Sequence, residues 1–313
     1  MKLPSQGSRL AALGILLTLS LTDSPGGSIV LPSVADTSLS ENYPSNNFGA
    51  VTFVNAGTTQ NQTRNRGLFR FAPAGALPPG ARITQANLVL EVRHTPSGGY
   101  AFADFTLHRL LRDWGEGRGT SPASGNTPGA GSPTLIGEAT WQSPLALTPA
   151  LWAGPGALAP NDYVTFPSSS QTIYGLNDSP YTFATTARMV ADVQDWLDQP
   201  ATNFGWILIC EAEATAFTAR RFASREDVNY GPLLQLDYLL PPAINGLTRT
   251  GSRLEIHFEA QADQGYDLLF SRDPSGQNGW NTLAQLPPAG TPGPMVFTAN
   301  LDSATGFFRL QTH

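Results

Sequence analysis

Four aromatic residues stand in or beside long stretches of the chain that lack a periodic apolar pattern. Residues 115–134 are rich in Gly, Pro and Ser, and residues 141–181 are also irregular. Long loops inside a compact domain often carry function. Aromatic rings stack on the apolar faces of sugars, while a few polar groups fix the orientation. The candidate carbohydrate contacts are Trp114, Trp141, Trp152 and Tyr163. For Trp141 and Trp152, a core position at the base of the loop is the alternative.

Cationic chemistry in this chain rests on arginine. Lys2 is the single lysine among 18 basic residues, so Schiff-base and phosphate-loop chemistry have no lysine beyond it. Guanidinium groups match planar carboxylates, which makes Arg64, Arg66, Arg220 and Arg221 candidate contacts to an acidic sugar. Local ion pairs within the protein are the alternative for such residues. The net charge of −6 repels uronates at long range, so such binding depends on a local patch and weakens with salt.

A structural calcium ion is the one cofactor that the residues suggest. Sandwich modules often hold calcium through hard oxygen ligands. Asp36 on the expected first strand and Asp237 on the expected last strand would meet if those two strands pair. A zinc site needs three or four clustered ligands, whereas the four histidines are scattered along the sequence.

The chain lacks the sequence signatures of common catalytic sites. It has no G-x-S-x-G elbow, no H-E-x-x-H, no C-x-x-C and no Walker loop, so we expect a protein that is not an enzyme. The alternative is a polysaccharide lyase or hydrolase with dispersed residues, in which His108 or a loop tyrosine acts as acid or base and an arginine neutralises a uronate. For hydrolysis, which needs two spatially paired carboxyl groups, the candidates are Asp104, Asp113, Glu116 and Glu138.

Short apolar runs separated by Gly and Pro predict an all-β chain. The composition is low in charge, at 13%, and high in breakers, with 31 Gly and 26 Pro, which is typical of a sandwich and excludes a coiled coil. The expected fold of residues 29–240 is a jelly-roll-like β-sandwich with one short helix. That helix spans 187–198, with Thr185 or Thr186 as its cap and Pro200 after its end. Cys210 closes an apolar run that predicts a buried strand and an inert thiol.

The N-terminal residues indicate where the protein is located, and the net charge limits its partners. Residues 1–28 have the basic start and the 12-residue apolar run of a signal peptide, which is too short to span a bilayer. We therefore expect a secreted or cell-surface protein with no membrane span after signal removal. The acidic balance argues against nucleic acid as a partner. The pair Pro241-Pro242 predicts a boundary before a small second domain at 241–313.

An ordered set of motifs resembles the DNRLRE-domain family over roughly residues 30–240. The set is Val34-Ala-Asp36, Arg66-Gly-Leu-Phe-Arg-Phe71, Ile83-Thr-Gln-Ala-Asn-Leu-Val-Leu90, Asp113-Trp-Gly-Glu116, Glu138-Ala-Thr-Trp141, Val190-Ala-Asp-Val-Gln-Asp-Trp-Leu197, Asn203-Phe-Gly-Trp206 and Phe222-Ala-Ser-Arg-Glu226. The resemblance implies a β-sandwich of exported bacterial and archaeal proteins, related to a carbohydrate-binding module found beside alginate-degrading enzymes and to disaggregatase. Residues 241–313 resemble a fibronectin type III-like module through Tyr266-Asp-Leu-Leu-Phe-Ser271, Trp280-Asn-Thr-Leu283 and Gly306-Phe-Phe-Arg-Leu310.

These observations predict an exported, non-catalytic protein that binds polysaccharide or extracellular matrix glycan. The alternatives are the lyase or hydrolase described above, and a structural surface or matrix scaffold without a small-ligand site. Clustering of Trp114, Trp141 and Trp152 on one open face would favour binding. A cleft that joins His, Tyr and Arg would favour the lyase, and burial of all the aromatic residues would favour the scaffold.

Overall fold

The computed structural model describes residues 26–78, 80–118, 129–240, 242, 244–261, 264–273, 279–300 and 306–312. The expected signal peptide lies outside these residues except for its last three positions, which belong to strand β1 (Gly26–Pro32). No helix in the described part of the chain is long and apolar enough to cross a membrane.

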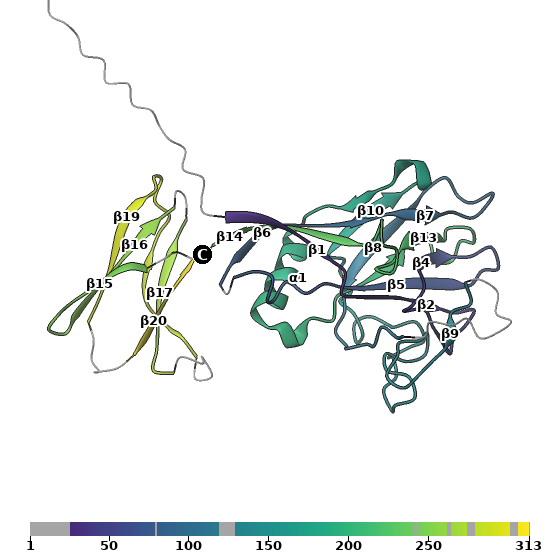
Figure 1. Ribbon diagram of the computed structural model, residues 1–313, viewed down its shortest axis with the longest axis horizontal. Coiled ribbons are helices and arrows are strands. Elements are labelled where there is room, and N and C mark those ends of the chain that lie inside the picture. Colours follow the sequence, from purple (N-terminus) through teal and green to yellow (C-terminus); the bar gives the residue numbers. More distant parts are fainter. Residues whose placement is uncertain are drawn as a thin grey trace, which may run out of the picture.

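Two antiparallel sheets build the part of the chain before residue 240 (Figure 1). The first sheet has four strands in the order β1, β14, β6 and β11. Its alternating pattern is clear on β6, where Ala86, Leu88 and Leu90 are fully buried and the residues between them are more exposed. This alternation follows from the period-2 geometry of a strand with one buried face. The other bounds are β14 (Leu233–Leu239), β6 (Arg82–Leu90) and β11 (Tyr181–Phe183).

The second sheet is larger and curls around, with eight strands. Its path runs β10, β8, β12, β5, β4, β13 and β7, and β2 pairs with β5 off this path. The short strands β3 (Asn46–Asn47) and β9 (Ser132–Pro133) pair with each other apart from it. The bounds are β2 (Ala35–Ser40), β4 (Phe53–Thr58), β5 (Arg64–Arg70), β7 (Val92–His94), β8 (Ala103–Arg109), β10 (Ser169–Ile173), β12 (Trp206–Cys210) and β13 (Arg220–Ala223).

The main core lies between these sheets, and helix α1 (Ala187–Asp198) packs onto it. The Thr186 side chain caps the helix by accepting a hydrogen bond from the Met189 amide at 3.0 Å, as helix N-caps do. The rings of Trp196 and Trp206 meet edge to face at 4.5 Å. The predicted helix and its capping residue are therefore confirmed. Two short 3₁₀ turns, Leu176–Asp178 and Pro200–Thr202, complete the described helical segments.

The chain beyond residue 243 forms two further three-stranded sheets around its own core. Phe258 is fully buried there, with its ring 5.0 Å from Tyr266 and 5.6 Å from Phe297. The sheets are β15 (Ile244–Thr250), β16 (Arg253–Ala260) and β19 (Gly293–Asn300), and β18 (Asn281–Leu286), β17 (Tyr266–Ser271) and β20 (Phe307–Thr312). The predicted class, all-β with one short helix, is thus confirmed.

Candidate functional site

The three tryptophans predicted to stack on sugar are core residues. Trp114, Trp141 and Trp152 are 2%, 3% and 5% exposed. They form a second apolar cluster on β5 and β12, with Leu68 and Ile207. The Trp114 Nε1 donates to the Phe204 carbonyl at 2.8 Å, and the Trp152 Nε1 donates to the Thr140 carbonyl at 2.9 Å. Rings this deeply buried present no face to a ligand, so the loop platform is absent and the core alternative holds for Trp141 and Trp152.

Tyr163 and His108 lie together at the edge of this second cluster. Tyr163 is half-buried, and its ring meets that of His108 edge to face at 5.2 Å. Both His108 ring nitrogens have partners, the Val164 carbonyl at 2.9 Å and the Thr106 hydroxyl at 3.0 Å. Burial lowers the pKa of His108, since the charged imidazolium would lose its hydration. These contacts give His108 a structural role rather than that of an accessible base.

Arg64 and Arg66 are satisfied within the protein. Arg64 makes a two-pronged pair with Glu41, at 3.0 and 2.7 Å. Arg66 pairs in the same way with Glu213, at 2.7 Å for both contacts, and its third nitrogen donates to two backbone carbonyls. The ion-pair alternative therefore holds for both residues.

Arg220 and Arg221 point to opposite faces of β13. Arg220 is 1% exposed and donates to four backbone carbonyls, those of Tyr100, Tyr174, Thr218 and Ala219. Arg221 is half-buried, and its guanidinium lies over the Phe53 ring at 3.9 Å. Its neighbour Phe222 is fully buried in the main core. Arg221 is thus the one predicted cationic contact that is left available.

Arg221 belongs to the floor of a polar cleft of about 460 Å³. We define the cleft by its lining: Ser40, Asn42, Tyr43, Asn55, Thr59, Gln60, Asn61, Thr63, Asn65, His94, Pro96, Ser97, Gly129, Ala219, Arg220 and Arg221. Five of these side chains are amides, which both donate and accept hydrogen bonds. A cleft of this size with amides, hydroxyls and a tyrosine suits a polyhydroxylated ligand.

A row of residues across three strands lines part of the cleft. Arg221 on β13 is the register partner of Asn55 on β4 and of His94 on β7. The next row, Val54, Phe222 and Val92, is fully buried in the core. On β4 and β13 the two rows are successive residues, which point to opposite faces, so Asn55 and Arg221 face away from that core. On β7, His94 and Val92 are two positions apart, and an irregularity in the register between Arg221 and Phe222 leaves His94 exposed beside Arg221.

No described carboxylate lies within ion-pair distance of Arg221, which is absent from the salt bridges of the described residues. Its Nε reaches the Asn55 Oδ1 at the long distance of 3.4 Å. Burial lowers the pKa of the guanidinium, although arginine stays charged near neutral pH. A guanidinium of this kind can form a two-pronged, charge-assisted pair with a planar carboxylate.

Three of the four acids considered for hydrolysis have hydrogen-bond partners other than carboxylates. Asp113 bonds Arg70 at 2.7 Å, Asp104 accepts from the Thr172 hydroxyl at 2.5 Å, and Glu138 accepts from the Arg118 and Leu135 amides. Of the four, Glu116 alone joins other carboxylates, as described next.

The predicted calcium pair does not form, because its two strands lie in different sheets. Asp36 is on β2, which pairs with β5, whereas Asp237 is on β14 between β1 and β6. The Asp237 carboxylate accepts from the Ser28 hydroxyl at 2.5 Å. Asp36 instead meets two acids that the sequence analysis did not pair with it.

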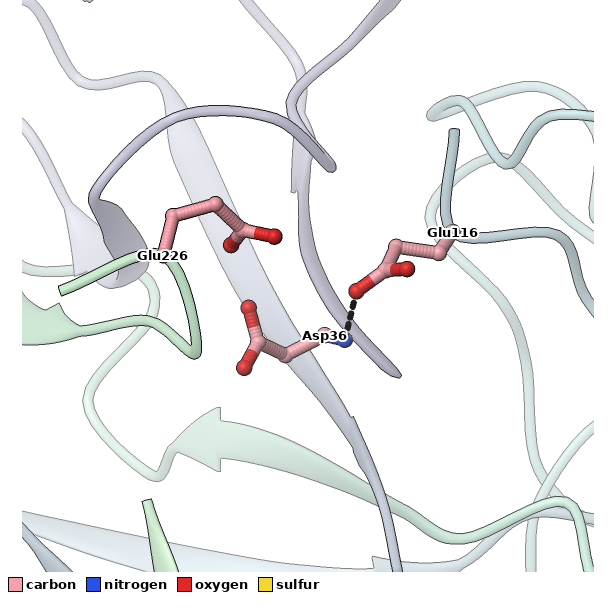
Figure 2. A group of neighbouring side chains, drawn as sticks. All are labelled: Asp36, Glu116 and Glu226. Carbon is pink, nitrogen blue, oxygen red and sulfur yellow. Dashed lines mark hydrogen bonds between the residues drawn. The ribbon is translucent and has the colours of Figure 1, made fainter. Parts of the chain in front are cut away.

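These three acids, Asp36, Glu116 and Glu226, form what we call the acid triad. One carboxylate oxygen of each lies within 4.8 Å of the others. Figure 2 shows the three side chains converging from β2, from the loop after β8 and from the loop after β13. The triad carries Arg225 at its side, whose Nη1 is 2.9 Å from Glu116 and 3.6 Å from Glu226.

Burial raises the pKa values of two triad members. Asp36 is 1% exposed, and loss of hydration holds its pKa well above the usual value, with Glu226 and Glu116 adding repulsion. The pKa of Glu116 rises to about 7 for the same first reason, against the lowering effects of the Asp36 amide and Arg225. Holding such carboxylates close together and partly out of water is unfavourable unless one of them is protonated or a cation lies beside them.

The alternation of buried and exposed residues around Asn55 and Arg221 is a sequence signal for the polar cleft. Asn55 stands between the buried residues Val54 and Ala56, and Arg221 stands between Arg220 and Phe222, so strict alternation points both outward. The cross-strand register that joins them to His94 is set by tertiary pairing and is invisible in the sequence.

No protein-family profile matches the chain. No curated protein sequence matches it significantly either, and the resemblance to the DNRLRE-domain family therefore stays a prediction.

Proposed function

We propose that this chain is an exported, non-catalytic protein that binds an acidic polysaccharide in the polar cleft. The observation that carries the proposal is Arg221, a half-buried guanidinium that lines the amide-rich cleft and has no carboxylate partner among the described residues. A uronate carboxylate is the planar anion that this fork matches. The ring hydroxyls would bond the surrounding amides and hydroxyls, and Tyr43 offers an aromatic surface at the rim.

The acidic net charge shapes how such binding works. At −6 the whole protein repels a polyanion, so affinity depends on short-range contacts within the cleft rather than on steering. The complex is therefore expected to weaken with salt, since its one charged contact is partly screened.

The test is affinity electrophoresis of the chain from residue 26 onward through gels that contain either a neutral glucan or a polyuronate. Retardation by the polyuronate alone supports the proposal. Retardation by the neutral polymer alone would remove the reason for invoking Arg221. The absence of retardation by either polymer would favour the scaffold alternative.

One observation favours a second candidate, a polysaccharide lyase. The cleft joins Tyr43, His94 and Arg221, which are the residue types needed for β-elimination. With Arg221 neutralising the uronate carboxylate, His94 or Tyr43 would take the C5 proton. The C4–O4 bond then breaks, its electron pair leaves with O4, which takes up a proton, and a C4–C5 double bond remains. His94 replaces His108 in this role, because His108 is enclosed.

A single incubation separates the two candidates. Elimination creates an unsaturated uronate that absorbs in the ultraviolet, whereas binding alone leaves the polymer intact. We expect retardation without new absorbance. Absorbance that grows with wild-type protein and is lost in His94→Ala would establish the lyase in place of the binding protein.

A further inference from the structure

The acid triad is distinct from the polar cleft, because none of its three residues lines the cleft. Its members come from three segments far apart in sequence. Asp36 lies on β2, Glu116 follows β8, and Glu226 follows β13. Chance surface acids are solvated, but here Asp36 is 1% exposed and the other two are half-buried.

The hydrogen bonds of the triad leave one oxygen unused at its most buried point. The Asp36 Oδ2 accepts the Arg225 amide at 2.8 Å. The Asp36 Oδ1 is buried and accepts no hydrogen bond among the described residues. The nearby Ser33 hydroxyl lowers the pKa of Asp36 and is the last of the causes that act on it; the same hydroxyl donates to the Ala35 and Arg70 carbonyls at 3.0 and 3.2 Å. A buried carboxylate oxygen without a partner is costly.

The remaining contacts hold the other two carboxylates in place without occupying them fully. The Asp36 amide donates to Glu116 Oε1 at 2.9 Å, which ties β2 to the loop (Figure 2). The Ser224 hydroxyl donates to Glu226 Oε2 at 3.0 Å. Among the described residues, the other oxygen of Glu226, Oε1, has only Arg225 as a partner, at 3.6 Å. Oxygens of Asp36 and Glu226 are thus free to take a common ligand, with Glu116 beside them.

We propose that Asp36, Glu116 and Glu226 bind a calcium ion that ties β2 to the loops after β8 and β13. Two oxygens bound to one calcium at about 2.4 Å lie at most about 4.8 Å apart, and the triad oxygens meet that limit. Three carboxylates with Arg225 beside them carry a formal charge that a divalent cation balances. All the side-chain donors are hard oxygens, which suit calcium rather than a thiolate- or imidazole-seeking metal. Water would complete the coordination.

Calorimetric titration with calcium alone, after removal of metal with a chelator, tests the proposal on the chain from residue 26 onward. We expect one site per molecule and a rise in melting temperature of about 5 °C at saturating calcium. Magnesium should bind more weakly, since it prefers fewer carboxylates and retains water. No heat and no shift in melting temperature with calcium, or tighter binding of magnesium, would overturn the assignment.

Two neutral variants keep the test independent of folding. In Asp36→Asn and Glu226→Gln an amide oxygen can still accept from Arg225 N and from the Ser224 hydroxyl. Both should lose calcium binding by at least about tenfold, and Asp36→Asn should melt no lower than the metal-free wild type, because it removes a buried, repelled charge. Calcium affinity that is unchanged in both variants would contradict the site.

Glu213→Gln is the matched control. The Glu213 side chain is 16% exposed and paired with Arg66, and the Glu226 side chain that the same substitution changes is 25% exposed and lies beside Arg225. The control should melt lower than wild type but keep its calcium affinity. Equal loss of affinity in Glu213→Gln would mean that the metal responds to net charge alone, and would also contradict the site.

Discussion

Arg221 and His94 are register partners across the β13–β7 pair, on the face of the sheet away from the main core. The next pair along the two strands, Phe222 and Val92, is fully buried, and the register shifts between the two pairs because Arg93 separates Val92 from His94. Strand pairing therefore brings Arg221 and His94 together, and residues outside the strands, among them Gln60, Asn61 and Ser97, complete the lining of the cleft.

Trp152 is predicted to matter for stability and not for binding. Trp152→Ala removes a ring that is 5% exposed, and a large-to-small change at such a position costs about 3–5 kcal/mol. Urea denaturation measures the loss. Affinity for a polyuronate, normalised to folded protein, should stay unchanged. A loss of affinity in a variant with wild-type stability would return this tryptophan to the binding surface.

Arg66 is predicted to stabilise the fold, because its side chain links β5 to Glu213 and to the backbone at residues 156–157. Arg66→Ala leaves the Glu213 carboxylate and the Gly156 and Ala157 carbonyls without their donor. Breaking a buried pair in this way costs about 3–5 kcal/mol, and the Arg66 side chain is only 10% exposed. Chemical denaturation of Arg66→Ala and Arg66→Lys reports the cost. A change below about 1 kcal/mol for both would show that the fork is dispensable.

His108 is predicted to make the fold less stable in acid. Burial lowers its pKa below about 6.5, its ordinary value, with Arg66 lowering it further and Glu211 opposing. The unfolded chain therefore binds the proton more readily, so the stabilisation present above pH 6.5 is lost as the pH falls from that value toward the folded pKa.

The measurement is the free energy of unfolding of wild type and His108→Gln between pH 7.5 and pH 5. The Val164 carbonyl can only accept, so the Nδ1 of the neutral ring carries the proton, and a glutamine amide offers a donor there. The difference in stability between wild type and variant should shrink or reverse toward pH 5. A difference that is constant across this range would show that His108 does not titrate in the window.

Local pattern predicted the elements far better than the sites. The spacing from Met189 to Leu197 and the position of Thr186 determined the helix, and the apolar run to Cys210 marked a buried strand, because both depend on neighbours in sequence. The sequence also singled out Asp36 and Arg221 as site residues. Their partners depend on which strands pair and on where two long loops return.

The tryptophans were predicted to bind sugar but lie in the core. An aromatic residue in a Gly- and Pro-rich stretch gave the same sequence signal for a binding platform as for a satellite core. Trp114 and Trp141 belong to the core because β5 and β12 present Leu68 and Ile207 on their outer face, which needs a cover. That requirement arises only once the sheet has formed.

The most direct test of the account compares wild type, Arg221→Ala and Arg188→Ala on a polyuronate affinity gel at low and at moderate salt. Arg188 is the matched control: exposed, on α1, with its guanidinium over the Phe166 ring at 5.1 Å and outside the cleft lining. A charged hydrogen-bond partner contributes about 1.5–3 kcal/mol, so Arg221→Ala should bind at least about tenfold more weakly. Arg188→Ala should be retarded as strongly as wild type, and the retardation of both proteins should be weaker at moderate salt than at low salt. Equal retardation of all three proteins would contradict the assignment of the polar cleft as the binding site.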